Sequence, residues 1–312
     1  MTGTLSTASL SSVAPRPAAF RREASAATVE PPAWVRRCVG AADRATDDLD
    51  FGSVEMSRSD RGTLATIRVR DARSLDADAM RVATAALYRR LFAEATRGGR
   101  HVVRIWNHIP GIHDPLGEER DRYRVFNAGR FDALCDLFGG REGLAASTPT
   151  ASGVGHAGRD LVVHALATDA PGRPIENPAQ VPAYEYSRRY GKLPPCFARA
   201  TVVDLDGPTV LVAGTAAISG EDSRHPGDLD RQITLTLDNL RRLLTAAGVV
   251  ATEPLDHFRD VRVYVPRPGD VATVREAMAE AFAGRAVECL VADLCRPELL
   301  VEIEGVAARE AD

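Results

Sequence analysis

Hydrophobic and polar positions along the chain predict the same order of elements twice. In each half, two extended runs flank a turn, and an amphipathic helix, a strand, a second helix and a further strand follow. The first half is expected to contain a hairpin over 50–70, helices over 79–96 and 122–138, and strands over 101–107 and 161–167. The second half is expected to contain a hairpin over 198–204 and 209–218, helices over 229–247 and 271–283, a strand over 262–265, and a last strand reached through 287–293. The chain is therefore predicted to be an α/β (α+β) protein of two similarly built units.

The same pattern sets the expected domain boundaries. Residues 1–45 are expected to form a disordered extension, because their first part is rich in Ala, Ser, Thr and Arg and lacks periodicity. An N-terminal α/β domain is expected over 46–170 and a C-terminal domain over 198–312. The connecting segment 171–197 is rich in Pro and Tyr, and a connection of this length is often functional. It either lines a binding site or packs the two domains together.

Two acidic residues interrupt the apolar run that ends the chain. In a strand over 299–304, Leu299, Val301 and Ile303 share one face, while Glu302 and Glu304 lie on the other. One interpretation places both carboxylates on the wet face of an edge strand, since acidic residues are rarely buried. The other places Glu302 in a cleft beside Cys295, where partial desolvation would raise its pKa and suit it to general acid catalysis.

Composition narrows the classes of function. The chain has 312 residues, of which 45% are hydrophobic and 26% charged, as in soluble globular proteins, and its net charge of −4 argues against a nucleic-acid-binding surface. No apolar run is long enough to span a bilayer, so a cytoplasmic protein is expected. The five cysteines include no CxxC pair, so neither a disulfide framework nor a metal site is expected.

Several sequence blocks resemble known families. The stretch 213–248 (AGTAAISGEDSRHPGDLDRQ…), followed by VEIEGVA at 301–307, resembles the RidA family of small α/β proteins. A closer resemblance, to the chorismatases, rests on five blocks in the same order: RIWNHIPGI (104–112), YRVFNAGR (123–130), NPAQVPAYEYSRRYGKLPPCFARA (177–200), AGTAAISGE (213–221) and ADLCRPELLVEIEG (292–305). This resemblance implies two RidA-like, chorismate-mutase-like units, each a sheet with helices packed on one face.

The chorismatase resemblance also implies an activity. Chorismatases split the enolpyruvyl ether of chorismate, release pyruvate, and need neither a metal nor an organic cofactor. The family's catalytic glutamate corresponds to Glu302. A cysteine seven residues earlier, here Cys295, resembles the branch that forms 3-hydroxybenzoate; other branches form a dihydroxycyclohexadiene carboxylate, or 3- and 4-hydroxybenzoate. The resemblance leaves a monomer and a homotrimer both open.

Hydrolysis of an enol ether is limited by protonation of its methylene carbon, which produces an oxocarbenium ion. Glu302 could deliver the proton and then, as a carboxylate, stabilise the cation. The substrate's two carboxylates need positively charged or hydroxyl partners. Inside the matched blocks the candidates are Arg104, Arg124, Arg130, Arg199, Tyr184, Tyr186 and Tyr190, about half of which we expect to contact substrate. Gly214, Thr215 and Ala216 either let the backbone approach the ligand closely or simply form a tight strand end.

Two other functions compete with this interpretation. A RidA-like deaminase is disfavoured because Asp293 and Leu294 stand near the place where RidA proteins carry a carboxylate-binding arginine. A catalytically silent module that binds a small acid would be stabilised by chorismate without turning it over. Cys295 could equally be a buried, inert cysteine.

Overall fold

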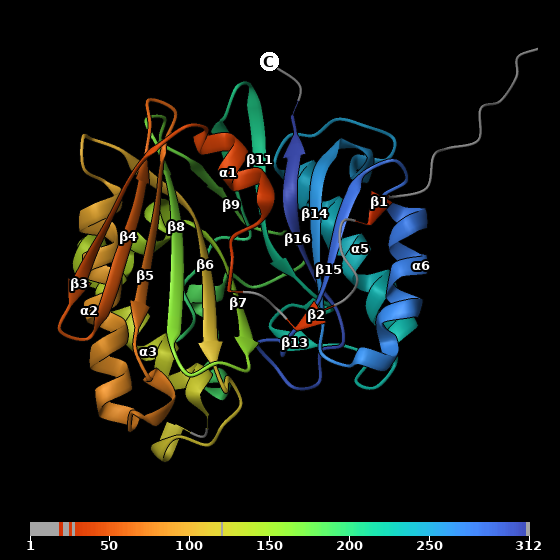
Figure 1. Ribbon diagram of the computed structural model, residues 1–312. Helices are drawn as coiled ribbons and strands as arrows, with labels where there is room; N and C mark the ends of the chain where they lie inside the picture. The colour runs from red at the N-terminus through yellow and green to blue at the C-terminus, as the bar shows by residue number, and fades with distance from the viewer. Residues whose placement is uncertain (1–18, 21–24, 27–28, 120, 310–312) are drawn as a thin grey trace, which may run out of the picture.

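Two β-sheets face each other, and the long helices cover their outer faces (Figure 1). The structure is a computed structural model and describes residues 19–20, 25–26, 29–119 and 121–309. Within these residues, no helix has the length and apolar character that a membrane span requires.

The N-terminal sheet has six strands in the order β3-β4-β5-β8-β6-β7, and all neighbours are antiparallel except β6 and β7. Helices α2 and α3 pack side by side on one face, where Tyr88, Leu91 and Phe126 are fully buried. This helical face forms the N-terminal core. The elements are β3 (Asp43–Leu49), β4 (Gly52–Arg58), β5 (Thr63–Val69), α2 (Ala77–Ala95), β6 (His101–Pro110), α3 (Arg122–Phe138), α4 (Leu144–Ser147), β7 (Thr150–His156) and β8 (Leu161–Thr168).

The C-terminal sheet has eight strands, seven of them in the order β1-β15-β14-β16-β11-β10-β9, with β2 also paired to β15. Its outer face packs on α5, whose buried Leu240 and Leu244 belong to the second core, and on α6. The elements are β1 (Ala19–Phe20), β2 (Ser25–Ala26), β9 (Arg173–Ile175), β10 (Ala200–Asp204), β11 (Pro208–Thr215), α5 (Leu229–Ala246), β14 (Phe258–Val265), α6 (Val271–Ala281), β15 (Ala286–Val291) and β16 (Glu302–Ala308).

A third apolar cluster joins the inner faces of the two sheets. It combines Trp106 of β6 and Leu166 of β8 with Leu211 of β11 and Val306 of β16. The sheets also meet where β7 passes β11, beside a parallel bridge between Thr150 and Ala198. Polar residues on the inner faces are therefore enclosed between the sheets.

The predicted helices and most strands are confirmed, and the predicted helix over 122–138 has the observed bounds of α3. The strand β7 was not predicted. The final strand begins later than expected, at Glu302, so Leu299 packs with Tyr264 and Leu290 and not with Val301. The edge-strand interpretation is wrong, because β16 lies between β14 and β11 and both of its glutamates are buried.

The expectation of disorder over residues 1–45 is also wrong in part. Helix α1 (Ala33–Val39) buries Trp34, Val35 and Val39, and β3 begins at Asp43. Residues 1–18, 21–24 and 27–28 lie outside the described residues. Helix α1 escaped prediction because it is only seven residues long and its N-cap, Pro32, has no side-chain cap bond.

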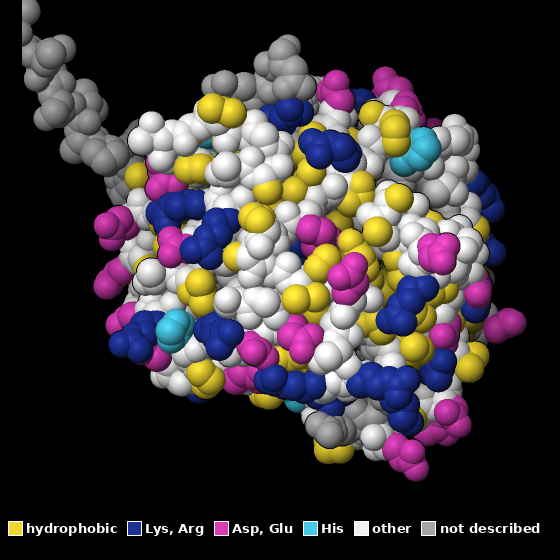
Figure 2. Space-filling model, turned by 180° about the vertical axis from the view of Figure 1, so that it is seen from behind, with side chains coloured by type: hydrophobic (Ala, Val, Ile, Leu, Met, Phe, Trp, Pro, Cys, Tyr) yellow, Lys and Arg dark blue, Asp and Glu magenta, His cyan; other side chains and the backbone are white. Residues whose placement is uncertain are grey.

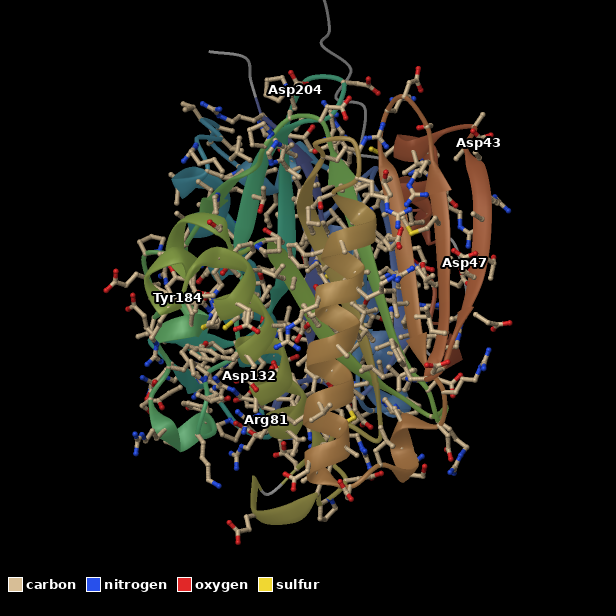
Figure 3. The ribbon with its side chains drawn as sticks, turned by 90° about the vertical axis from the view of Figure 1, so that its left-hand side faces the viewer. Asp43, Asp47, Arg81, Asp132, Tyr184 and Asp204 are labelled. Atoms are coloured by element: carbon tan, nitrogen blue, oxygen red, sulfur yellow. The ribbon has the colours of Figure 1, made fainter. Side chains whose placement is uncertain are left out.

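Charges on the surface are mixed in sign. Basic and acidic side chains are interspersed on the face shown in Figure 2. Asp43 and Asp47 project from β3, the exposed edge strand of the N-terminal sheet (Figure 3). Charged residues on an edge strand discourage pairing with another chain.

Replacing Trp34 with alanine tests whether α1 is an integral part of the fold. Trp34 is 7% exposed, and its ring lies edge-on to Trp106 with 5.9 Å between the centroids. We expect Trp34→Ala to lower the free energy of unfolding by about 3 kcal/mol or more, measured by urea denaturation. Val82→Ala, at a position 68% exposed, is the control and should change it by less than about 0.5 kcal/mol. Equal stability of the two variants would show that α1 does not pack on the sheets.

Candidate active site

A cavity of about 340 Å³ opens between the two halves of the chain. Four parts of the chain line it: the start of α3, the connecting segment, the end of β11, and the loop that leads into β16. A cavity of this size is at the small end of the range for small-molecule sites, about 300–1,000 Å³. Its lining residues are Asp121, Tyr123, Arg124, Asn127, Tyr186, Tyr190, Pro195, Phe197, Arg199, Gly214, Ala216, Ile218, Cys295, Arg296, Pro297, Glu298 and Glu302.

Glu302 is the buried carboxyl group of this cavity. It is the first residue of β16, pairs with Tyr264 of β14, and is 3% exposed. Among the described residues, its polar side-chain contact is the thiol of Cys295, with 4.0 Å between Sγ and Oε2. Burial, and secondly the negative charge of Glu304, raise the pKa of Glu302 to about 8. The carboxyl group is therefore largely protonated at neutral pH and can act as an acid.

Gly214 makes room for that carboxyl group. The register between β11 and β16 shifts between Val212 and Thr215, and this irregularity places Gly214 against Glu302. A Cβ atom at position 214 would overlap Oε1 of Glu302. Gly214 also donates its backbone N–H to Oγ of Ser152 at 2.8 Å. The position therefore requires glycine if Glu302 is to keep its place.

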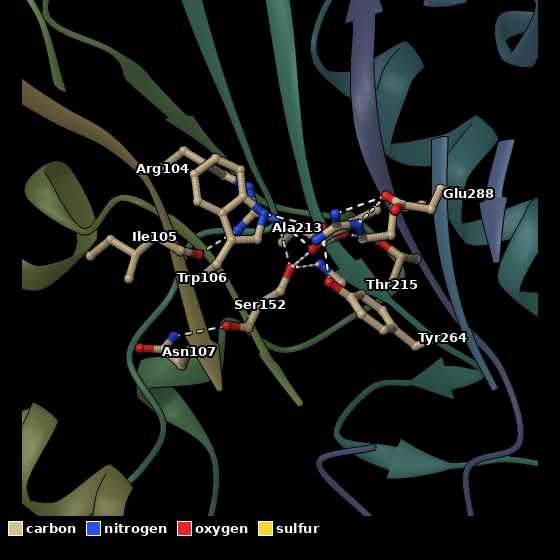
Figure 4. A network of polar contacts seen from close by, with 12 residues as sticks. Arg104, Ile105, Trp106, Asn107, Ser152, Ala213, Thr215, Tyr264 and Glu288 are labelled. Carbon is tan, nitrogen blue, oxygen red and sulfur yellow. Dashed lines mark hydrogen bonds and ion pairs between the residues drawn. The ribbon is translucent and has the colours of Figure 1, made fainter. Parts of the chain in front are cut away.

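Glu304, two residues further along β16, is surrounded by hydrogen-bond donors, among them Arg104, Trp106, Ser152 and Tyr264, which Figure 4 labels. Oε2 accepts from Nη2 of Arg104 at 2.7 Å and from the hydroxyl of Ser152. Oε1 accepts from Nε1 of Trp106 at 3.1 Å and from the hydroxyl of Tyr264 at 3.2 Å. Four donors saturate both oxygens, so Glu304 is held as a carboxylate although it is 1% exposed.

Arg199 presents a buried positive charge to the cavity. Its Nη2 donates to the hydroxyl of Tyr186 at 2.6 Å, and its guanidinium lies 4.8 Å from the ring centroid of Phe197. Its buried Nε makes no hydrogen bond to any residue that the structure describes and lies 4.0 Å from the carboxylate of Glu176. Arg199 thus brings a positive charge to the cavity wall, where it can attract an anionic ligand.

Arg296 is a lining residue that the sequence analysis missed. Its guanidinium stacks 3.9 Å from the ring centroid of Tyr190, and Nη1 donates to the carbonyl oxygen of Glu221 at 2.8 Å. The signal was present, because Arg296 follows Cys295 in the matched block, but the expected arginine was sought at positions 293 and 294. Tyr123 and Asn127 of α3 were missed as well. They lie on the cavity side of an otherwise buried helix, which periodicity alone does not distinguish from core.

Of the predicted site residues, eight line the cavity together: Glu302, Cys295, Arg124, Arg199, Tyr186, Tyr190, Gly214 and Ala216. Four others do not line it. Arg104 is paired with Glu304 between the sheets, and Thr215 is buried with its hydroxyl bonded to the carbonyl oxygen of Ala213. Arg130 is buried and donates to Asn127 at 2.8 Å. Tyr184 packs against the N-terminal core, beside α3 (Figure 3). The structure therefore places these four away from the cavity wall, and their contact with substrate stays an untested prediction.

Comparison with known proteins decides the family. The family model "Chorismatase FkbO/Hyg5-like, N-terminal" matches residues 40–167, and "Endoribonuclease L-PSP" matches residues 198–309. A "3-hydroxybenzoate synthase" of Streptomyces hygroscopicus is 40% identical over 239 residues, which cover 72% of this chain and 68% of the relative. The chain belongs to the chorismatase family.

Further similarities support the same family. A "Chorismatase" of Streptomyces rapamycinicus is 35% identical over 240 residues, covering 72% of this chain and 70% of the relative. A solved crystal structure of a chorismatase matches with a TM-score of 0.73 and 32% identity, covering 84% of this chain and 79% of that one. The predicted two-unit α/β fold is thereby confirmed.

The buried acid of this chorismatase family member should make stability depend on pH. A raised pKa means that the folded chain holds the Glu302 proton more tightly than the unfolded chain does. The resulting stability is complete below the unfolded pKa of about 4.3 and is lost as the pH rises through about 8. Glu302→Gln removes this loss. Relative to the unaltered protein, its free energy of unfolding should increase by about 3 kcal/mol between roughly pH 6 and pH 9, measured by urea denaturation.

Glu288→Gln is the matched control. Glu288 is also partly buried between strands of the same sheet, but it is paired with Arg262 at 2.8 Å and does not line the cavity. A difference between Glu302→Gln and the unaltered protein that stays constant across this pH range would contradict a protonated Glu302.

Proposed function

We propose that the protein is a chorismatase that cleaves the enolpyruvyl ether of chorismate into pyruvate and 3-hydroxybenzoate, with Glu302 as the general acid. The observation that carries the proposal is a buried carboxyl group, with its pKa raised by burial, that faces a small cavity lined by arginines. The relatives named for this reaction and substrate match most of the chain.

The lining supplies what the substrate's two carboxylates need. Arg124, Arg199 and Arg296 reach the cavity from three different parts of the chain. Arginine binds carboxylates in two parallel hydrogen bonds, and holding both ends of a small molecule accounts for much of the positioning that catalysis requires. Tyr186 and Tyr190 are held by Arg199 and Asp222 and add hydroxyl groups to the same wall.

The chemistry then proceeds by proton transfer. Glu302 donates its proton to the methylene carbon of the enolpyruvyl group, and the ether carbon becomes an oxocarbenium ion. The new carboxylate of Glu302 lies beside this cation and stabilises it. The oxygen of the neighbouring ring hydroxyl then displaces pyruvate, which leaves with the ether oxygen and the electron pair of the broken ring C–O bond, and the hydroxyl proton returns to Glu302. The ring oxide formed in this way opens, and one ring hydrogen moves to the oxygen as a proton, which gives 3-hydroxybenzoate. The two products together contain the atoms of chorismate, so no oxidant or reductant is consumed.

Cys295 lies where it can influence the fate of the ring. Burial, and secondly the charge of Glu302, raise the pKa of its thiol to about 12, so the thiol is neutral. A neutral thiol is a poor nucleophile, and we infer that Cys295 orients the ring intermediate toward 3-hydroxybenzoate without forming a covalent bond to it.

The site is lined by one chain from both of its halves, and we propose that a monomer in the cytoplasm is sufficient for activity.

Glu302→Gln tests the acid. The amide keeps the size of the side chain but cannot deliver a proton, so pyruvate release from chorismate should fall by about a hundredfold or more. Chorismate should still raise the melting temperature of the variant, since the arginines remain. Glu288→Gln is again the control and should keep its rate. Turnover by Glu302→Gln near the normal rate would refute Glu302 as the acid.

Cys295→Ala tests the product branch. Removing the thiol leaves the acid and the arginines in place, so pyruvate should be released within about tenfold of the normal rate. Chromatography of the ring products should show less 3-hydroxybenzoate and more of the dihydroxycyclohexadiene carboxylate. Cys38→Ala, at a cysteine outside the cavity lining, is the control. A product spectrum that matches the control would remove Cys295 from the reaction.

A further inference from the structure

Two carboxyl groups lie in the polar layer between the sheets, and their hydrogen bonding differs. Glu304 accepts hydrogen bonds from four side chains, whereas Glu302 has one weak contact. Arg104, Trp106 and Ser152 come from the N-terminal sheet, and Tyr264 comes from the C-terminal sheet. All four donate to Glu304. Glu302, on the same face of the same strand, has only the thiol of Cys295 at 4.0 Å among the described residues.

Ser152 connects Glu304 to the backbone that lies beside the Glu302 carboxyl group. Its hydroxyl proton is used on Glu304, so its oxygen is free to accept, and it accepts the backbone N–H of Gly214. Gly214 is the residue whose missing side chain leaves space for the Glu302 carboxyl group. One continuous set of hydrogen bonds therefore runs from Arg104 through Glu304 and Ser152 to the backbone beside Glu302.

We propose that Glu304, with the donors that hold it as a carboxylate, is a positioning residue for the reaction: it occupies the donors and the counter-charge of Arg104, and so keeps the proton on Glu302. This inference rests on the proposed function and deepens it. Glu304 does not line the cavity and acts through Glu302.

The signs of the nearby charges agree with this role. Burial is the largest cause that raises the pKa of Glu302 and the charge of Glu304 is the second, whereas Arg104 and Arg199 each act in the opposite direction and each more weakly than Glu304. Replacing Glu304 by a neutral residue would also leave Arg104 without its anionic partner, and this buried cation would then stabilise the carboxylate form of Glu302 and favour loss of its proton. The charged and titratable groups that face Glu302 are Glu304 on β16, Arg104 on β6, Arg199 before β10, Tyr123 on α3 and Cys295 in the loop before β16.

The test is the pH profile of Glu304→Gln in the full chain. For the unaltered protein, kcat/KM for pyruvate release should fall as the pH rises through the pKa of Glu302. In Glu304→Gln this fall should begin about one pH unit lower. The factor by which kcat/KM of Glu304→Gln falls below that of the unaltered protein should therefore be about tenfold greater at alkaline pH than at the acidic plateau. A purely structural role would instead lower the rate equally at every pH.

Two further variants keep the test decisive. Arg104→Met/Glu304→Gln removes both charges together and leaves no unpaired ion between the sheets, so it covers the case in which Glu304→Gln fails to fold. In this double variant the fall of kcat/KM should also begin at a lower pH than in the unaltered protein, but the change should be smaller than in Glu304→Gln. Glu94→Gln is the matched control: it neutralises another buried carboxylate that is paired with an arginine, Arg58, but lies outside the cavity lining, and the pH at which its rate falls should not change. A fall that begins at the unaltered protein's pH in the folded Glu304 variants would overturn the proposal.

A measurement without substrate separates this inference from the proposed function. The infrared band of a protonated carboxyl group, assigned to Glu302 by its loss in Glu302→Gln, should titrate at lower pH in Glu304→Gln than in the unaltered protein. If the unaltered protein releases no pyruvate, the proposed function fails, and the band still shows whether Glu304 sets the proton on Glu302. A band that titrates identically in both proteins would refute the positioning role even if turnover were normal.

Discussion

Two carboxyl groups on neighbouring inward positions of one buried strand cannot both keep a negative charge unless donors compensate each of them. β16 carries such a pair, and the structure compensates only one. Glu304 receives four hydrogen bonds and the charge of Arg104, while Glu302 faces the cavity with a thiol beside it. The difference in protonation between two chemically identical side chains follows from this distribution of donors.

The fold explains how the donors come to be there. Because the two sheets pack face to face, β6 and β7 of the first half can reach a carboxylate on β16 of the second (Figure 4). The same packing leaves a cavity at the carboxyl end of β11, which the connecting segment covers with Tyr186 and Tyr190. The connection between the halves thus belongs to the wall of the site. Neither half alone contains both the acid and the groups that control it.

The sequence predicted most of the helices and strands and singled out Glu302, but it did not predict which side chains contact the site residues. Helix α5 has strong amphipathic periodicity and helix α3 has a clear end at Gly139, and both were predicted nearly to the residue. Periodicity placed Glu302 and Glu304 on one face, but whether that face is wet depends on β6 and β7, which lie about half the chain away in sequence. Arg104 illustrates the limit: it lies in a matched block like Arg199, yet its partner is 200 positions away. Arg296 was overlooked because the arginine was sought at positions 293 and 294, and the ring that holds Arg296, Tyr190, comes from the distant connecting segment.

The central claim is that an exchangeable acid of the protein, and not a hydrogen of the substrate ring, protonates the enolpyruvyl group. Turnover of chorismate in deuterium oxide tests it most directly, with the pyruvate reduced to lactate as it forms and its methyl group analysed by mass spectrometry. The carboxyl proton of Glu302 exchanges with solvent, so the account predicts one deuterium in that methyl group. A methyl group that carries no deuterium would mean that its hydrogen came from the ring, and would contradict general acid catalysis by Glu302.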